Sequence, residues 1–430
     1  MGHARAGDGR TVKIALVGFG TIGSSVYKVI QKEHDAILEA TGLDLRVAYI
    51  VEKDFSRAGI DAPAELFTGD FQHALDDPGV SIVVELIGGT GWAFTFVDGA
   101  LRAGRDVVTA NKQLLANRGA ALFDLADELG RQIRFEASVG GAIPIIKVMR
   151  ESMIAADLHT VYGIVNGTTN YILTAMYRGE GGYEDTLKKA QQLGYAEADP
   201  TADVGGADAA AKMAILASLA YRSRVTMDDV TYEGIQEVSL EDVQYAKEFG
   251  FVVKLIGAAR LVDGRVNVRV HPALVPEGHP LASINGSYNA VYVKGHTIDE
   301  IMLTGPGAGG PPTATAVVSD IVNIAGTGAV GFLQSCTCYK TLDLYPDQEM
   351  HSAFFIRFKV EDRAGVLAQI ASIFEEYAVS IESMIQKGHG DEAELVLITH
   401  PTMEQGFFAA MERVAGLSCV MSRPLTIRVL

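Results

Sequence analysis

A glycine-rich turn near the start of the chain, G-F-G-T-I-G at residues 18–23, constrains the fold more than any other feature. It follows an apolar run of strand length at 12–17 and opens a helical pattern that continues beyond residue 24. A strand, a glycine turn and a helix in this order are typical of dinucleotide binding, because the N–H groups at the helix start face the pyrophosphate. An ordinary strand-to-helix turn without a ligand is the alternative interpretation.

Strand and helix patterns alternate from residue 12 to about residue 142. Strands are predicted at 12–17, 45–51, 81–87, 106–110 and 133–137, and helices at 21–40, 92–103 and 113–129. This alternation predicts an α/β domain with a Rossmann-type, doubly wound parallel sheet over residues 12–142. Pro144 marks the start of the next helix.

The middle of the chain, residues 143–315, predicts an α+β domain for substrate binding and dimerisation. Its strands are expected at 158–165, 251–260, 265–271 and 289–294, and its helices at 183–193, 207–220 and 240–248. The glycine- and proline-rich stretch 304–313 is expected to be neither helix nor strand. A helix from Thr315 to about Ala325 would return the chain to the first domain, which residues 316–340 would complete.

The C-terminal residues 353–430 follow a linker expected near 331–352. Strands at 353–360, 379–386, 393–399 and 422–429 and helices at 366–377 and 403–414 give the order β-α-β-β-α-β. That order is typical of a ferredoxin-like domain.

Composition excludes several classes of protein. The 430 residues carry a formal net charge of −17, whereas a nucleic-acid-binding surface is basic. Three cysteines are too few for a disulfide framework, and Cys336 and Cys338 lack the further ligands of a zinc site. No apolar run reaches the roughly 18 residues of a membrane-spanning helix. We therefore expect a cytoplasmic protein with neither a nucleic-acid nor a membrane partner.

Polar residues follow two strands of the predicted parallel sheet, where ligands gather in such folds. Gly88 and Thr90 follow one strand end, and T-A-N-K (109–112) places Lys112 at the next. A solvated surface lysine is the alternative interpretation. A further strand end leads into E-A-S-V-G-G-A-I-P at 136–144.

The middle domain contributes amides, hydroxyls and acids. N-G-T-T-N at 166–170 follows an apolar strand and also suits a well-capped helix start. Asp208 and Lys212 lie four residues apart on a predicted helix, so a simple ion pair would explain them. Because their neighbours on that helix are small and apolar, a lysine held beside carboxylates is also a plausible proton donor.

Taken together, these segments resemble homoserine dehydrogenase over residues 12–325. The resemblance rests on GFGTIG, TANK, EASVGGAIP, GIVNGTTNYIL (163–173), YAEADPTADVGGADAAAK (195–212) and GPGAGGPPTATAVVSDI (305–321), in the order of that family. The C-terminal segment resembles an ACT domain, an amino-acid-sensing module, with D-R-A-G-V-L at 362–367. The resemblance implies NAD(P)-dependent interconversion of L-aspartate 4-semialdehyde and L-homoserine, in the biosynthesis of threonine, methionine and isoleucine.

The resemblance also implies roles for individual residues. The catalytic residues would be Lys212, as the proton donor, and Lys112. The substrate would be bound by Glu197, Asp203, Asp208, Asn166, Gly167, Thr168 and Lys212. The cofactor would be bound by Gly18, Phe19, Gly20, Thr21, Ile22, Gly23, Lys53, Arg57, Gly88, Thr90, Lys112, Gly307 and Thr315. A monovalent cation, expected to be Na⁺, would be held by Glu136 and the carbonyls of Val139, Gly141 and Ile143.

The residues after the second strand bear on the choice of cofactor. An acid there favours the ribose of NAD, and a basic residue accommodates the 2′-phosphate of NADP. Glu52 and Lys53 compete for this position, and the basic Arg57 favours NADP. The ACT-like domain either binds an amino acid, for which threonine is the expected effector, or serves only to dimerise the chain. A homodimer or homotetramer is expected.

Two rival functions make different demands on the sequence. An aspartate-semialdehyde dehydrogenase needs a nucleophilic cysteine in mid-chain, and none lies between Met1 and Gln334. A non-catalytic sensor of nucleotides and amino acids would bind ligands without turnover, and would have no need of Lys112, Lys212 and the acidic loop together.

Overall fold

The computed structural model describes residues 9–327 and 336–430. The chain divides into two compact units. Unit 1 comprises Met1–Val161, Ala211–Asp229 and Asn289–Thr341, and unit 2 comprises Tyr162–Ala210, Val230–Tyr288 and Leu342–Leu430. None of the helices within the described ranges is long and apolar enough to cross a membrane.

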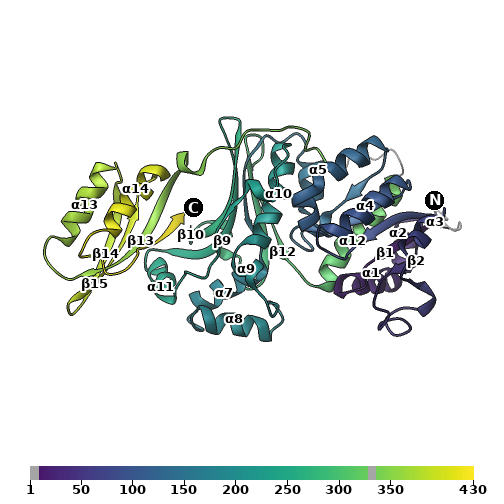
Figure 1. Ribbon diagram of the computed structural model, residues 1–430, viewed down its shortest axis with the longest axis horizontal. Helices are drawn as coiled ribbons and strands as arrows, with labels where there is room; N and C mark the ends of the chain where they lie inside the picture. Colours follow the sequence, from purple (N-terminus) through teal and green to yellow (C-terminus); the bar gives the residue numbers. More distant parts are fainter. Residues whose placement is uncertain (1–8, 328–335) are drawn as a thin grey trace, which may run out of the picture. The chain divides into compact units, whose positions relative to one another are not determined.

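A six-stranded parallel sheet forms the centre of unit 1 (Figure 1). Its strands are β1 (Arg10–Val17), β2 (Leu43–Val51), β3 (Phe67–Thr68), β4 (Val80–Glu85), β5 (Asp106–Thr109) and β6 (Ile133–Arg134). Their spatial order, β3-β2-β1-β4-β5-β6, is that of a doubly wound dinucleotide-binding domain and confirms the predicted fold class. The strand expected at 133–137 ends at Arg134, because a short 3₁₀ turn begins at Glu136.

Helices follow these strands at α1 (Thr21–Lys32), α2 (His34–Thr41), α3 (Phe71–Asp76), α4 (Gly91–Arg102) and α5 (Lys112–Glu128). The single helix expected at 21–40 is two helices that meet at Glu33, which is outside helical geometry. Apolar residues repeat on both sides of Glu33, so the pattern did not reveal the break. The second helix ends at Gly42, whose left-handed φ of 72° closes it.

The last helix of unit 1, α12 (Gly310–Thr327), packs on α1 and completes the core of the parallel sheet, with Val317 and Ile321 beside Ile14 and Val26. The loop expected at 304–313 is wrong at both ends: β12 (Asp299–Pro306) runs into it, and α12 begins at Gly310. Prolines in a first helical turn lose no hydrogen bond, so Pro311 and Pro312 are compatible with the helix start.

Unit 1 also contains α6 (Ile145–Lys147) and strands β7 (Leu158–Ile164) and β11 (Tyr288–Gly295), with β11 between β12 and β7 in the sheet. Strand β7 extends into unit 2 from Tyr162 to Ile164, and β11 begins there with Tyr288. The start of the expected helix after Pro144 is confirmed, and a π-helical turn continues it over Val148–Ser152.

Unit 2 begins with helices and continues with a long hairpin. The elements are α7 (Gly167–Tyr177), α8 (Tyr183–Gln192), α9 (Thr201–Val204), the start of α10 (Ala207–Tyr221), β8 (Thr231–Tyr232), α11 (Leu240–Glu248), β9 (Phe251–Val262) and β10 (Arg265–Pro276). From Ala211 onward, α10 belongs to unit 1. Strands β9 and β10 pair antiparallel along their whole length. Asp263 and Gly264 both have positive φ, as a two-residue hairpin turn requires.

The C-terminal part of unit 2 has the predicted β-α-β-β-α-β order. It consists of β13 (His351–Glu361), α13 (Val366–Glu376), β14 (Ile381–His389), β15 (Glu392–Thr399), the short β16 (Thr402–Met403), α14 (Glu404–Ala415) and β17 (Leu425–Val429). Both helices pack on one sheet through a core that includes Phe358, Phe374 and Phe407 (Figure 1). The ferredoxin-like prediction is confirmed.

A buried ionic cluster joins this C-terminal domain to β10. The Glu404 carboxylate is 1% exposed and accepts hydrogen bonds from Arg269 Nη1 at 2.7 Å, Ser352 Oγ at 2.7 Å and Arg428 Nη2 at 2.9 Å. Beside the cluster, β17 pairs in parallel with β10 at Ala273↔Arg428. The two arginines hold the pKa of Glu404 below its usual value despite its burial.

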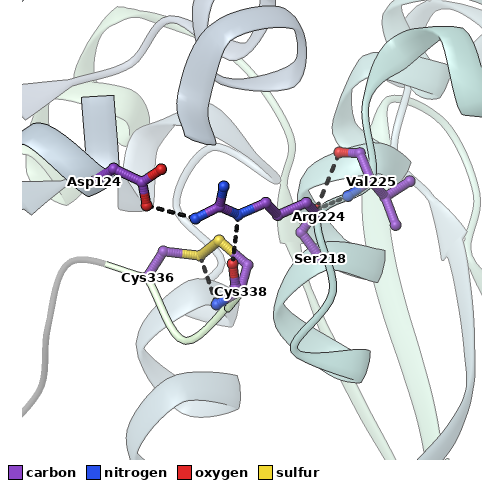
Figure 2. The surroundings of a disulfide bond; sticks show 6 residues. All are labelled: Asp124, Ser218, Arg224, Val225, Cys336 and Cys338. Atoms are coloured by element: carbon purple, nitrogen blue, oxygen red, sulfur yellow. Dashed lines mark hydrogen bonds and ion pairs between the residues drawn. A yellow bond between two sulfur atoms is a disulfide. The ribbon is translucent and has the colours of Figure 1, made fainter. Parts of the chain in front are cut away.

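One disulfide bond is present, between Cys336 and Cys338 (Figure 2). The spacing of the cysteines did not predict this bond. Arg224 holds the segment, since its Nε donates to the Cys338 carbonyl at 3.3 Å and its Nη2 to Asp124 at 2.5 Å. The expected linker at 331–352 lies partly outside the described residues, and its described end carries this bond.

Candidate active site

The glycine turn of unit 1 is closely packed at Gly18 and Gly23 and open at Gly20. Gly18 has a φ of +99°, and a Cβ there would lie 2.8 Å from Ile87. A Cβ on Gly23 would lie 2.2 Å from the Gly18 carbonyl oxygen, whereas one on Gly20 would meet nothing within 4 Å. The first and third glycines are therefore required by packing, and the second lets a ligand approach the start of α1.

Charged residues after β2 surround this turn. The Glu52 carboxylate accepts from the Phe19 N–H at 2.7 Å and from the Lys53 N–H at 2.8 Å. Arg57 Nη1 donates to the Gly20 carbonyl at 3.3 Å, and Lys53 lies over the Trp92 ring, 5.2 Å from its centroid. The Phe19 ring is buried in the core, so this predicted cofactor residue presents only its main chain to the turn.

The ends of β4 and β5 are joined by a carboxylate that the sequence analysis did not single out. Glu85 is fully buried and accepts from Thr109 Oγ1 at 2.6 Å, from the Ile87 N–H at 2.9 Å and from the Gly88 N–H at 3.2 Å. Burial raises the pKa of Glu85. The sequence feature that points to Glu85 is its position as an acidic residue at the end of an otherwise apolar strand.

The hydrogen bonds of the neighbouring Asn111 determine the position of Lys112. Asn111 donates to the Gly89 carbonyl at 2.7 Å and caps α5 by accepting from the Leu114 N–H at 3.0 Å. Lys112 is therefore fixed as the first residue of α5, half-buried at the carboxyl end of the sheet. Thr90, at the neighbouring strand end, is the N-cap position of α4.

The predicted cation residues form one buried turn. Glu136 accepts from the Ile146 and Lys147 N–H groups, both at 2.8 Å, and its own N–H donates to Asp320. Burial and the Asp320 carboxylate raise the pKa of Glu136 to about 7. A cation beside Glu136 would stabilise the charged form of this buried carboxylate. Carboxylate and carbonyl oxygens are the hard ligands that such an ion prefers. Val139, Gly141 and Ile143 follow in the same turn.

The glycine loop between β12 and α12 is packed tightly from two sides. A Cβ on Gly141 would lie 2.7 Å from the Gly307 carbonyl carbon, and a Cβ on Gly307 would lie 2.0 Å from Asn289 Cγ. Asn289 is fully buried, and neither polar atom of its amide has a hydrogen-bond partner among the described residues. Thr315, in contrast, is exposed and bonds within its own helix to the Pro311 carbonyl.

In unit 2, the structure brings together most of the predicted substrate residues. Asn166 Nδ2 donates to Asp203 at 2.8 Å and to Asp208 at 2.9 Å, while its Oδ1 caps α7 by accepting from the Thr169 N–H at 2.9 Å. Thr168 Oγ1 lies 3.2 Å from the second Asp203 oxygen. Asn166 thus brings two carboxylates together, and carboxylates are groups that can bind an ammonium group.

Two other predicted residues, Glu197 and Lys212, differ from this group in their surroundings. Glu197 is exposed, and its carboxylate has no hydrogen bond or ion pair with any described residue. Lys212 is 8% exposed and follows Asp208 by one turn of α10, among alanines and Met213 that are themselves buried. An almost buried lysine one turn from an almost buried carboxylate can move a proton to or from a reacting oxygen.

Comparison with known proteins agrees with this chemistry. The model of the homoserine dehydrogenase NAD-binding domain matches residues 18–136, and that of homoserine dehydrogenase itself matches 144–322. A homoserine dehydrogenase from Bacillus subtilis is 40% identical over 432 residues, covering 98% of each chain. The chain belongs to the homoserine dehydrogenase family. As a member, it is an NAD(P)-dependent oxidoreductase.

Solved structures of the family share the fold over nearly the whole chain. A homoserine dehydrogenase from Thiobacillus denitrificans superposes with a TM-score of 0.93 at 36% identity, covering 98% of each chain. One from Staphylococcus aureus at pH 8.5 gives 0.77 at 30% identity, covering 98% of this chain and 99% of the other. An ACT domain model matches residues 354–418, which confirms the prediction for the C-terminal domain. The alternative of a non-catalytic sensor gains no support.

Proposed function

We propose that this chain interconverts L-homoserine and L-aspartate 4-semialdehyde, with Lys212 as the proton donor and Lys112 as the second catalytic lysine. The cluster of Asn166, Asp203 and Asp208 at the start of α10 carries the proposal, because it supplies negative charge for the substrate ammonium group. Helix α10 then presents Lys212 one turn further along. Glu197, whose exposed carboxylate has no partner among the described residues, would add a further carboxylate for the ammonium group.

The cofactor, when bound, supplies the hydride that is added to the aldehyde carbon. The aldehyde oxygen then gains negative charge, and a cationic Lys212 beside it stabilises that charge and delivers a proton to give the alcohol. In the reverse direction, the same lysine accepts the alcohol proton. The substrate wall, formed by Asn166, Gly167 and Thr168, orients the substrate and leaves the proton transfer to the lysine.

NADP is the proposed cofactor, although NAD stays the alternative. Both oxygens of Glu52 already accept main-chain N–H groups of the turn and its neighbour, which leaves less capacity for a ribose hydroxyl. Lys53 and Arg57 are exposed beside the same turn and offer positive charge to a 2′-phosphate. Residues 18–23, Gly88, Thr90, Gly307 and Thr315 would complete the cofactor site, and Glu136 with three carbonyls would hold Na⁺.

For the ACT domain, we propose that threonine binds at the turn before α13. A cavity of about 290 Å³ lies there, lined by residues 360–367 with Gln386 and Leu395. Gly365 precedes α13 with a φ of +90°, so the first N–H groups of the helix are available to a carboxylate. A role in dimerisation alone is the alternative. A cytoplasmic homodimer or homotetramer serving threonine, methionine and isoleucine biosynthesis belongs to the same proposal.

The test is to follow nicotinamide absorbance with purified protein and L-homoserine, using NAD⁺ and NADP⁺ in turn, with and without threonine. We expect faster turnover with NADP⁺, stimulation by Na⁺ and inhibition by threonine. Faster turnover with NAD⁺ would refute the assignment of Lys53 and Arg57. Turnover that threonine leaves unchanged would favour dimerisation as the role of the ACT domain.

A further inference from the structure

A fully buried lysine, Lys254, lies on β9 within unit 2. Burial, with a smaller contribution from the charge of Arg178, lowers the pKa of Lys254 to about 7. Removing an ammonium group from water is costly, and an apolar side chain of similar length would avoid that cost. The contribution of this lysine must therefore come from the directed hydrogen bonds that it makes.

Those hydrogen bonds go to oxygens on two other segments. Lys254 Nζ donates to the Ile284 carbonyl at 2.5 Å, to Asn170 Oδ1 at 3.0 Å and, more weakly, to Asn285 Oδ1 at 3.5 Å. Asn170 belongs to α7, whereas Ile284 and Asn285 begin the loop 284–288, whose last residue, Tyr288, is also the first residue of β11. The lysine thus fixes a helix and a loop relative to the strand that carries it.

Helix α7 holds the same loop through two further side chains. Asn170 Nδ2 donates to the Ile284 carbonyl at 3.2 Å and to the Tyr288 carbonyl at 3.0 Å, so that it spans the loop from one end to the other. Thr174 Oγ1 accepts from the Gly286 N–H at 3.2 Å. The loop is therefore fastened at its beginning, middle and end, and Lys254 holds the amide oxygen of the residue that spans it.

The fastened loop presses directly on the predicted substrate wall. A Cβ on Gly167 would lie 2.8 Å from the Ser287 carbonyl oxygen, so the first turn of α7 rests on the middle of the loop. Asn166, immediately before Gly167, is the residue that holds Asp203 and Asp208. It is also joined to Asn170 by the hydrogen bond from the Asn170 N–H to the Asn166 carbonyl, at 3.3 Å.

We infer that Lys254 is a positioning residue for the amino-acid substrate, acting through Asn170 and the loop 284–288 to fix Asn166, Gly167 and Thr168. The inference rests on the proposed substrate role of that wall. Because the lysine lies beneath the wall without being part of it, its loss shifts the anionic site by a fraction of an ångström and weakens homoserine binding. The contacts at the glycine turn of the cofactor lie outside this network.

The test compares Lys254→Met with Lys254 intact, in steady-state kinetics with each substrate varied. We expect the KM for homoserine to rise about 10- to 100-fold, because small misplacements in a substrate site have effects of that size. The KM for NADP⁺ should stay within about twofold. Thr174→Val removes the acceptor for the middle of the loop at nearly constant volume. It should shift the same constant in the same direction by a smaller factor, which keeps the test informative if Lys254→Met does not fold.

Leu255→Ala is the matched control. Leu255 is its neighbour on β9, is 4% exposed and points to the opposite face of the strand. It should lower the melting temperature and leave the KM for homoserine unchanged. If folded Lys254→Met keeps the wild-type KM for homoserine, or raises both KM values equally, the inference is overturned. A wild-type protein without homoserine turnover would refute the proposed function instead.

Discussion

Replacing Gly307 by alanine perturbs the glycine loop at its tightest point. The new Cβ would lie 2.0 Å from Asn289 Cγ and 2.2 Å from both polar atoms of the amide, whereas ordinary contact begins at 3.4 Å. The loop or the amide must therefore move by about 1 Å, and such a misplacement near reacting groups can cost about 100-fold in rate. Overpacking of this kind costs about 1–3 kcal/mol in stability.

The assay is kcat/KM for NADP⁺ at saturating homoserine, accompanied by thermal unfolding. We expect Gly307→Ala to lower kcat/KM by about 100-fold, which corresponds to about 2.7 kcal/mol. Gly326→Ala is the control, because its Cβ would meet nothing within 4 Å. It should leave kcat/KM unchanged and can even stabilise α12, since alanine favours helix by up to about 1 kcal/mol.

A double-mutant cycle decides whether the clash is the cause. Asn289→Ala removes the amide that obstructs the new methyl group, so Gly307→Ala should cost far less in that background. If the two changes are additive, the clash with Asn289 is not the cause of the loss. If Gly307→Ala retains wild-type kcat/KM, the assignment of this loop to the cofactor site is refuted.

Three further outcomes are expected. Asn166→Asp places a third carboxylate against two others, so the KM for homoserine should rise at least about tenfold; an unchanged KM contradicts the proposed substrate wall. Burial holds the pKa of His271 well below its usual value. Below about pH 6.5, His271 is therefore protonated in the unfolded state and stays neutral in the folded state. Stability should accordingly decline as pH falls below that value, and His271→Gln should flatten this decline in pH-dependent melting; an equal slope in both proteins rules the histidine out. Thiol titration of denatured protein should find one thiol, Cys419, without reductant and three after reduction; three in both samples would mean that Cys336 and Cys338 are not bonded.

Sequence patterns predicted the elements whose signals are local. The turn at Gly18 required only a strand, a glycine spacing and a helix, and the structure confirms all three. The β-α-β-β-α-β order of the C-terminal domain likewise followed from periodicity within each segment. The break at Glu33 did not, because apolar residues continue on both sides of it.

Contacts between distant segments were beyond the sequence. Nothing in the sequence around Lys254 indicates that its ammonium group donates hydrogen bonds to Asn170 and Ile284, which are 84 and 30 residues away. The same holds for Glu404, whose partner Arg269 is 135 residues distant. Glu85 differs, because an acid at the end of an apolar strand is a visible signal, and only the residues that it joins required the structure.

The measurement that tests the central claim most directly is homoserine-dependent reduction of NADP⁺ by the wild-type protein and by Lys212→Met. Lys13→Met serves as the control, since that lysine is exposed in the first half of β1, before the carboxyl end of the strand, and forms an ion pair with Asp77 at 3.2 Å. We predict turnover by the wild type and the control, and a loss of about 10²- to 10⁴-fold in kcat for Lys212→Met, with NADP⁺ binding retained. Turnover by Lys212→Met at the wild-type rate would contradict the account.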